Sequence, residues 1–148
     1  MAHETDAAPF LARWLDQAGQ RGDLYAPDCP ARAVLEHMTS RWGVLVLVTL
    51  LSGPRRFGEL KQSLSGVSDK MLTRTLKDLR RDGLVRRTSR YEDPPVIVDY
   101  HLTALGTEAA RLIAQLTDWI NDNLHDIHEA RRHHDLAPRD TERPPQES

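Results

Sequence analysis

The sequence predicts a mainly α-helical protein with one β-hairpin, an α+β fold. Apolar residues recur at helical spacing in several segments of the first half of the chain. Residues 68–81 carry a helix start, a helix end and two chemically distinct faces. Two short segments of strand-forming residues, 84–91 and 96–102, flank a loop that contains two prolines, an arrangement typical of a hairpin.

The composition indicates one domain with a strongly basic centre. At 148 residues the chain is long enough to bury a real core. Between Arg41 and Arg90 there are 12 Lys or Arg against 4 Asp or Glu, a net charge of +8, whereas the rest has 8 against 18, a net charge of −10. A basic centre between acidic ends predicts a region that binds a polyanion.

Cysteine usage and hydropathy indicate a cytoplasmic protein. The only cysteine, Cys29, excludes an intramolecular disulfide framework. The N-terminus, MAHETDAAPF, lacks the basic start and apolar run of a signal peptide. The apolar run Val44–Leu51 is too short to span a bilayer, so no membrane partner is expected.

Residues 1–28 are expected to form a short amphipathic helix and a linker. Gly19 or Gly22 should end this helix. Its apolar stripe consists of Phe10, Leu11, Trp14, Leu15 and Ala18. A short isolated helix needs an apolar surface to cover, which would be either its own core or a second subunit.

Three further helices are expected between Cys29 and Leu64. Asp28 or Cys29 can cap the first, because Pro30 suits a first helical turn. Its inward residues would be Val34, Leu35 and Met38. The run VLVLVTLL fits a buried strand as well as a buried helix. We favour a helix, which Ser40 could cap, because another helix at about 55–64 follows after only a tight turn; there Phe57, Leu60 and Leu64 would face inward.

The segment 68–81 has signals for both helix ends. Ser68 can accept a hydrogen bond from a free backbone N–H of the first turn. Gly83 can adopt a left-handed conformation after the last turn, so that Leu84 folds back on Leu79 in a Schellman-type closure. The turn Ser65-Gly66-Val67 joins this helix to the preceding one, which is the helix-turn-helix plan.

The two faces of this helix differ in chemistry. Leu72, Leu76 and Leu79 form an inward stripe. The opposite face is cationic and consists of Lys70, Thr73, Arg74, Lys77 and Arg81. Such side chains can neutralise phosphates and reach base edges, which predicts a DNA recognition helix. Taken alone, the helix would fit a merely solvated face equally well.

The hairpin after the helix is also basic. Arg86, Arg87 and Arg90 decorate it, and Pro94-Pro95 should lie at its tip because proline cannot donate to a strand ladder. A basic hairpin directly after a recognition helix is interpreted as a wing that reaches the adjacent sugar-phosphate backbone or minor groove, giving a winged helix-turn-helix. The alternative is an exposed hairpin kept soluble by its charge.

One long helix is expected after the wing, capped by Thr103. Its apolar positions are Leu105, Ala109, Leu112, Leu116, Trp119, Ile120, Leu124 and Ile127. Their early spacing resembles a coiled-coil seam, which predicts a dimer interface shared with the N-terminal helix. Packing wholly on its own domain is the alternative. From residue 128 the chain should be the charged end of the helix and then, beyond His134, a disordered tail.

Several of these motifs, in this order, resemble the HxlR-type helix-turn-helix family, dimeric winged-helix regulators of bacteria and archaea. The matching segments are Cys29-Pro30, the Trp42 region, LLSGPRRFGEL at 50–60, SDKMLTRTLKDLRRDGLVRR at 68–87 and YHLTALG at 100–106. The resemblance covers residues 29–127. It implies promoter binding by a dimer, with the groove-facing positions Ser68, Lys70, Met71, Thr73, Arg74 and Lys77. Backbone and wing contacts are expected from Arg41, Arg55, Arg56, Arg86, Arg87 and Arg90.

The sequence departs from the family at one turn. Members often carry Gly-Gly-Lys-Trp where this chain has Thr39-Ser40-Arg41-Trp42. Arg41 keeps the positive charge, so its contact with the DNA backbone is still expected.

Cys29 stands at the position of a cysteine that senses oxidants or electrophiles in some members. A helix N-terminus stabilises a thiolate, whereas the neighbouring Asp28 disfavours it. A small, partly buried structural residue is the preferred interpretation.

Catalysis, cofactors and metal binding are not expected. His101 lies near Asp99, but no motif places a nucleophile beside them. His125 and His128 share a helix face, which a solvated, charged helix end explains better than a metal site.

The function expected from the sequence is therefore sequence-specific DNA binding by a homodimer on a palindromic promoter site, most simply as a repressor. An oxidant, an electrophile or a small ligand is the candidate switch. A winged helix used only for protein–protein contact is the alternative, but a recognition face and a wing that are both cationic favour DNA.

Overall fold

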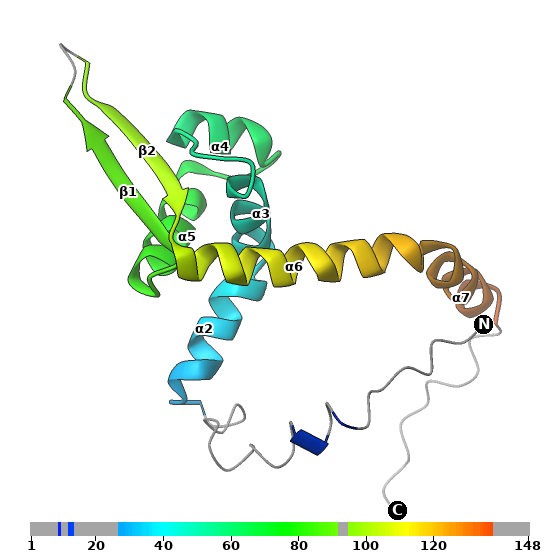
Figure 1. The fold of residues 1–148 in the computed structure, drawn as a ribbon. Coiled ribbons are helices and arrows are strands. Elements are labelled where there is room, and N and C mark those ends of the chain that lie inside the picture. The colour runs from blue at the N-terminus through cyan, green and yellow to red at the C-terminus, as the bar shows by residue number, and fades with distance from the viewer. Residues whose placement is uncertain (1–8, 10–11, 14–26, 92–94, 138–148) are drawn as a thin grey trace, which may run out of the picture. The chain divides into compact units, whose positions relative to one another are not determined.

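Figure 1 shows the computed structural model of the protein, which describes residues 9, 12–13, 27–91 and 95–137. Its elements are α2 (Pro30–Thr39), α3 (Arg41–Leu50), α4 (Phe57–Ser63), α5 (Asp69–Arg81), β1 (Val85–Arg90), β2 (Ile97–Leu102), α6 (Ala104–Asp122) and α7 (Leu124–Leu136). This order confirms the predicted α+β fold. The helix predicted at 10–18 lies outside the described residues, apart from positions 12 and 13.

The chain forms two compact units, Met1–Arg111 and Leu112–Ser148, which we describe separately. None of the described helices combines the length and apolar character needed to cross a bilayer.

The core of the first unit lies between α3, α4 and α5. The ambiguous apolar run is a helix, α3, and the Ser40 hydroxyl accepts a hydrogen bond from the Gly43 N–H at 3.0 Å, as expected for its cap. The largest fully buried side chains are Val46, Leu47, Leu60, Leu64, Leu72, Leu76 and Leu79. Each contributes about 1.5–3 kcal/mol through burial, so the buried inner face of α5 is the main contribution that holds this helix in place.

Helix α2 is buried less than predicted. Cys29 occupies its N-cap position without a side-chain capping hydrogen bond, and Pro30 opens it, as expected. Val34 and Met38 are half-buried, but Leu35 is 46% exposed, so its predicted inward orientation is wrong. The reason is that α2 contacts α3 and α5 along one side, and Leu35 is rotated by about 100° from Val34 around the helix.

The turn between α2 and α3 forms without the family's glycines. Ser40 has φ −61° and ψ 154°, an extended conformation that any residue can adopt. Its hydroxyl also donates to the carbonyl of His37 at 2.9 Å. The imidazole of His37 in turn lies 2.6 Å from the Asp82 carboxylate, measured from Nδ1 to Oδ2, which ties α2 to the end of α5.

Both predicted ends of α5 are confirmed. The Ser68 hydroxyl accepts from the Met71 N–H at 3.1 Å. At the other end Gly83 has φ +77°, and its N–H donates to the carbonyl of Arg80 at 3.0 Å. The Leu84 N–H donates to the carbonyl of Leu79 at 2.9 Å, which completes a Schellman motif.

The hairpin is anchored at its base and along one edge. Strands β1 and β2 pair antiparallel from Val85↔Leu102 to Arg90↔Ile97. Backbone hydrogen bonds of 2.9 and 2.8 Å also join Arg55 to Tyr100 of β2. Every residue of β2 is half-buried. Figure 1 shows the hairpin projecting from the end of α5.

Helix α6 begins on the turn that ends α5. The Thr103 hydroxyl accepts from the Gly106 N–H at 2.9 Å, which confirms the predicted cap, and it donates to the carbonyl of Gly83 at 2.6 Å. A Cβ on Gly106 would lie 1.8 Å from the carbonyl oxygen of Leu84. Only glycine therefore allows this close approach.

The single long helix predicted after the wing is wrong, because Asn123 separates α6 from α7. The side-chain amide of Asn123 donates to the carbonyl of Trp119 at 2.8 Å. This local bond competes with regular helix geometry, a common effect of asparagine. Helix α7 then continues to Leu136, beyond the predicted end at His134.

Two glycines with open space around their Cα atoms test the importance of the left-handed turn. No atom lies within 4 Å of a Cβ added to Gly83 or to Gly58, but only Gly83 has a positive φ. Gly83→Ala should therefore lower the free energy of unfolding by about 1–2 kcal/mol. Gly58→Ala, in helix α4, should leave it unchanged or raise it by up to about 1 kcal/mol. Urea unfolding followed by circular dichroism measures both, and equal effects would contradict the role assigned to the turn.

Candidate nucleic-acid interface

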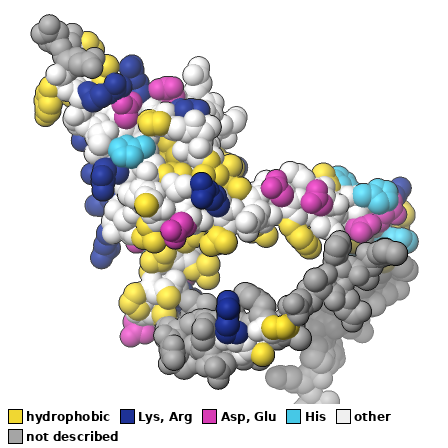
Figure 2. Space-filling view, viewed as in Figure 1, with side chains coloured by type: hydrophobic (Ala, Val, Ile, Leu, Met, Phe, Trp, Pro, Cys, Tyr) yellow, Lys and Arg dark blue, Asp and Glu magenta, His cyan; other side chains and the backbone are white. Residues whose placement is uncertain are grey.

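Helix α5 presents a cationic face to solvent. Its inner face is buried, whereas the predicted groove-facing residues are all exposed: Ser68, Lys70, Met71, Thr73, Arg74 and Lys77. Met71 is 42% exposed, a large apolar side chain among these polar ones. Figure 2 shows Lys and Arg side chains gathered along the edge of the molecule that carries β1 and α5.

The remaining predicted contacts fall into two groups. Arg56, Arg86 and Arg87 are exposed, and no ion pair of theirs occurs within the described ranges. Arg90 instead pairs with Asp99 across the hairpin at 2.8 Å, from Nη2 to Oδ2. The guanidinium of Arg55 donates to its own turn, at 2.9 Å to the carbonyl of Pro54 and 2.8 Å to the hydroxyl of Ser52. Arg55 and Arg90 are thus held by the protein itself.

Arg41 lies on the other side of α5 from the wing. Its guanidinium carbon is 4.7 Å from the ring centre of Trp42, a cation–π contact. Both residues line a recess of about 380 Å³ whose opposite wall includes Met71 and Arg74 of α5. The fold therefore brings Arg41 next to α5, although 33 positions separate it from Arg74.

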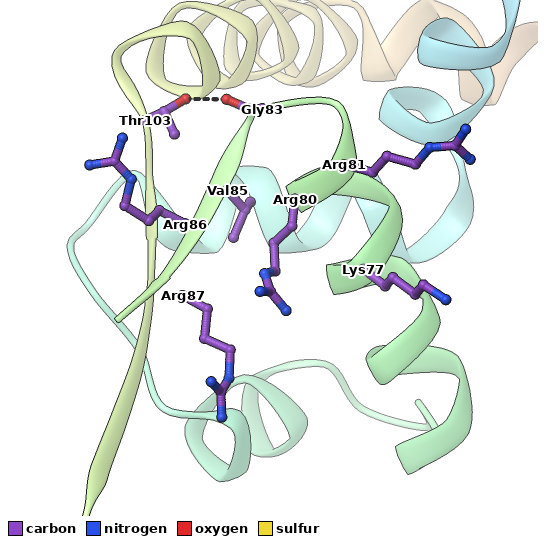
Figure 3. Close-up of a pocket in the computed structure, with 8 residues that line it drawn as sticks. All are labelled: Lys77, Arg80, Arg81, Gly83, Val85, Arg86, Arg87 and Thr103. Atoms are coloured by element: carbon purple, nitrogen blue, oxygen red, sulfur yellow. Dashed lines mark hydrogen bonds between the residues drawn. The ribbon is translucent and has the colours of Figure 1, made fainter. Parts of the chain in front are cut away.

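A second recess, of about 650 Å³, lies at the base of the wing. It is lined by Lys77, Arg80, Arg81, Gly83, Val85, Arg86, Arg87 and Thr103 (Figure 3). Five of these carry positive charge, and the lining found in the described part of the chain includes no acidic side chain. Arg80 is a lining residue that the sequence motifs did not single out. Its spacing of three from Lys77, on a helix followed by a basic strand, was the signal that pointed to it.

Two further candidates take no part in this surface. Cys29 is a free thiol, 7% exposed, at the N-cap of α2. His125 and His128 lie on α7, where the described residues bring together no group of three His, Cys, Asp or Glu side chains that could hold a metal.

Comparison with known proteins identifies the family. The profile described as HxlR-like helix-turn-helix matches residues 37–128, more than half of the chain. The chain belongs to the HxlR-like helix-turn-helix family. The resemblance inferred from the sequence motifs is thereby confirmed. The match begins eight residues after Cys29, so this cysteine lies outside the HxlR-like segment.

Similar proteins of this family are transcriptional regulators by name. The uncharacterized HTH-type transcriptional regulator YtfH of Escherichia coli (strain K12) is 45% identical over 113 residues, 76% of this chain and 89% of that protein. A solved structure of a transcriptional regulator, ytfH from Salmonella typhimurium, is 46% identical and has a TM-score of 0.68, covering 76% of this chain and 99% of that one. The oxidized form of the redox regulator HypR is 27% identical, with a TM-score of 0.58, over 64% of this chain and 97% of its own.

This HxlR-like protein is accordingly a transcriptional regulator of the helix-turn-helix kind, built as α4, the turn and α5, with the hairpin as the wing.

Proposed function

We propose that the protein is a homodimeric, sequence-specific DNA-binding repressor. The observation that carries this proposal is the outer face of α5, which is cationic, exposed and opposite a fully buried leucine stripe. Leu72, Leu76 and Leu79 hold the helix without using any side chain of the outer face. Lys70, Thr73 and Arg74 are then free to enter a major groove, where Arg can donate two hydrogen bonds to guanine.

A second copy of the chain is the proposed partner of α6. This helix exposes large apolar side chains at intervals of seven, four and three residues: Leu105, Leu112, Leu116 and Trp119. Each of the four is between 56% and 64% exposed. A continuous apolar stripe of this kind on a helix is typical of a helix–helix interface. Two-fold pairing would place two recognition helices about one DNA turn apart, on a palindromic site.

Repression follows most simply from binding near a promoter, where the dimer obstructs RNA polymerase. A winged helix that binds only proteins is the competing function. It would have no need for an exposed cationic face on α5 together with exposed arginines on the wing, such as Arg86 and Arg87.

Substitutions on α5 test DNA reading. Lys70→Ala and Arg74→Ala should weaken binding to DNA from upstream of the protein's own gene. Arg74→Ala should also lower the ratio of affinities for the specific and the random duplex, by about 10- to 100-fold. Fluorescence anisotropy with specific and random duplexes measures both effects. Arg131→Ala removes an exposed charge from α7 and is the matched control. If the wild type prefers no duplex over random DNA, the protein-binding alternative gains the support.

Substitutions on α6 test the dimer. Leu116→Glu places a charge in the proposed interface and should convert dimers into monomers, because an unpaired buried carboxylate costs several kcal/mol. Leu136→Glu, at a position on α7 that is 78% exposed, should leave the dimer intact. Sedimentation equilibrium distinguishes the two. A wild type that sediments as a monomer, or a Leu116→Glu variant that stays dimeric, would refute this interface.

Cys29 is proposed to have a structural role. HypR is a redox regulator by name, but the thiol of Cys29 is buried here, and buried thiols react slowly. Diamide should therefore leave operator affinity within about twofold for both the wild type and Cys29→Ser. Loss of binding in the oxidised wild type alone, with recovery in dithiothreitol, would instead establish a redox switch at this residue.

A further inference from the structure

The recess at the base of the wing contains two arginines that extend into one space. Figure 3 shows Arg80 and Arg87 pointing into the gap between α5 and β1. Lys77 and Arg81 extend from the far side of α5, and Arg86 extends past the other side of the hairpin. All five cations line the recess, and Arg80 and Arg87 are the two whose side chains are drawn between α5 and β1 in Figure 3.

Local geometry explains why these two residues converge. Arg80 follows Lys77 by three positions, so it is rotated by about 60° around the helix, away from the outer face of α5 and toward the wing. Arg87 follows Val85 by two positions and therefore lies on the same face of β1 as that buried residue. The Schellman turn at Gly83 joins the two elements and sets the gap between them.

The chemistry of the gap fits an anion. Among the described residues, the side chain of neither arginine takes part in a hydrogen bond or an ion pair. Two guanidinium groups in one recess repel each other unless an anion lies between them. Guanidinium forks match the oxygens of a phosphate group, to which they donate charge-assisted hydrogen bonds.

The position of the gap identifies the phosphate. When α5 lies in a major groove and the hairpin reaches the adjacent minor groove, the sugar-phosphate strand that separates the two grooves must pass between α5 and β1. We propose that Arg80 and Arg87 together clamp one backbone phosphate of this strand. This inference rests on the proposed function, and it adds Arg80 to the interface and assigns both arginines to a single phosphate.

Salt dependence tests whether the two arginines share one phosphate. Arg80→Ala and Arg87→Ala should each weaken specific and random duplexes equally, by about tenfold, and each should reduce the log–log salt slope by less than one, because the remaining arginine still neutralises the phosphate. The double variant should reduce the slope by about one, not by two. Arg131→Ala again serves as the control for charge, and circular dichroism confirms that each variant is folded. A double variant that loses two units of slope would overturn the shared clamp.

Neutral phosphates in the DNA locate the contact directly. Methylphosphonate is introduced at one backbone position at a time in the operator. One position should weaken the wild type most, weaken Arg80→Ala and Arg87→Ala less, and have no further effect on the double variant. Absence of such a position would overturn the proposal.

Pyrophosphate distinguishes backbone phosphate from a free phosphate ligand. If calorimetry shows that pyrophosphate binds the wild type but not Arg80→Ala, while both bind DNA equally, the recess serves a free ligand and the DNA clamp is wrong. If the wild type binds DNA and Arg80→Ala matches it in every assay, only the clamp fails. If the wild type binds no duplex at all, the proposed function fails first.

Discussion

The turn at Gly83 and Leu84 is the constraint on which the arrangement of the first unit depends. This turn ends α5 and starts β1. Its Gly83 carbonyl also accepts a hydrogen bond from the hydroxyl of Thr103, just before α6. The backbone of Gly106 lies so close to the carbonyl of Leu84 that only glycine fits at position 106. Helix α5, the hairpin and helix α6 therefore leave one small, rigid junction, which fixes the angle between α5 and the hairpin.

Rigidity at this junction matters because the charges beyond it repel one another. The segment from Arg41 to Arg90 carries a net charge of +8, and the recess at the base of the wing has no acidic lining residue in the described chain. Such an arrangement costs stability in the free protein and becomes favourable only beside a polyanion. The buried leucines of α3, α4 and α5 supply the apolar burial that holds the charges in place.

The elements of the HTH and wing could be predicted because their signals are local. Ser68 and Gly83 mark helix ends through hydrogen bonds and a backbone conformation that involve only near neighbours in the chain. The break at Asn123 was missed because asparagine is tolerated in helices, and its competing bond to Trp119 depends on the rotamer that it adopts. Leu35 was misplaced because a helical stripe shows that one face is apolar but not how wide the covered face is.

The sequence by itself determined the order of the elements, the caps, the buried stripe of α5 and the cationic character of its opposite face, since helical periodicity and capping act over a few residues. Only the tertiary structure decided how individual arginines are used. Arg55 and Arg90 are equivalent to Arg86 and Arg87 in composition. Within the described residues, however, only the side chains of Arg55 and Arg90 meet acceptors of the protein. Arg80 gains its place beside Arg87 only because the turn at Gly83 folds β1 back along α5. Such pairings join separate elements, and the chemistry of a side chain alone does not specify which neighbour it will meet.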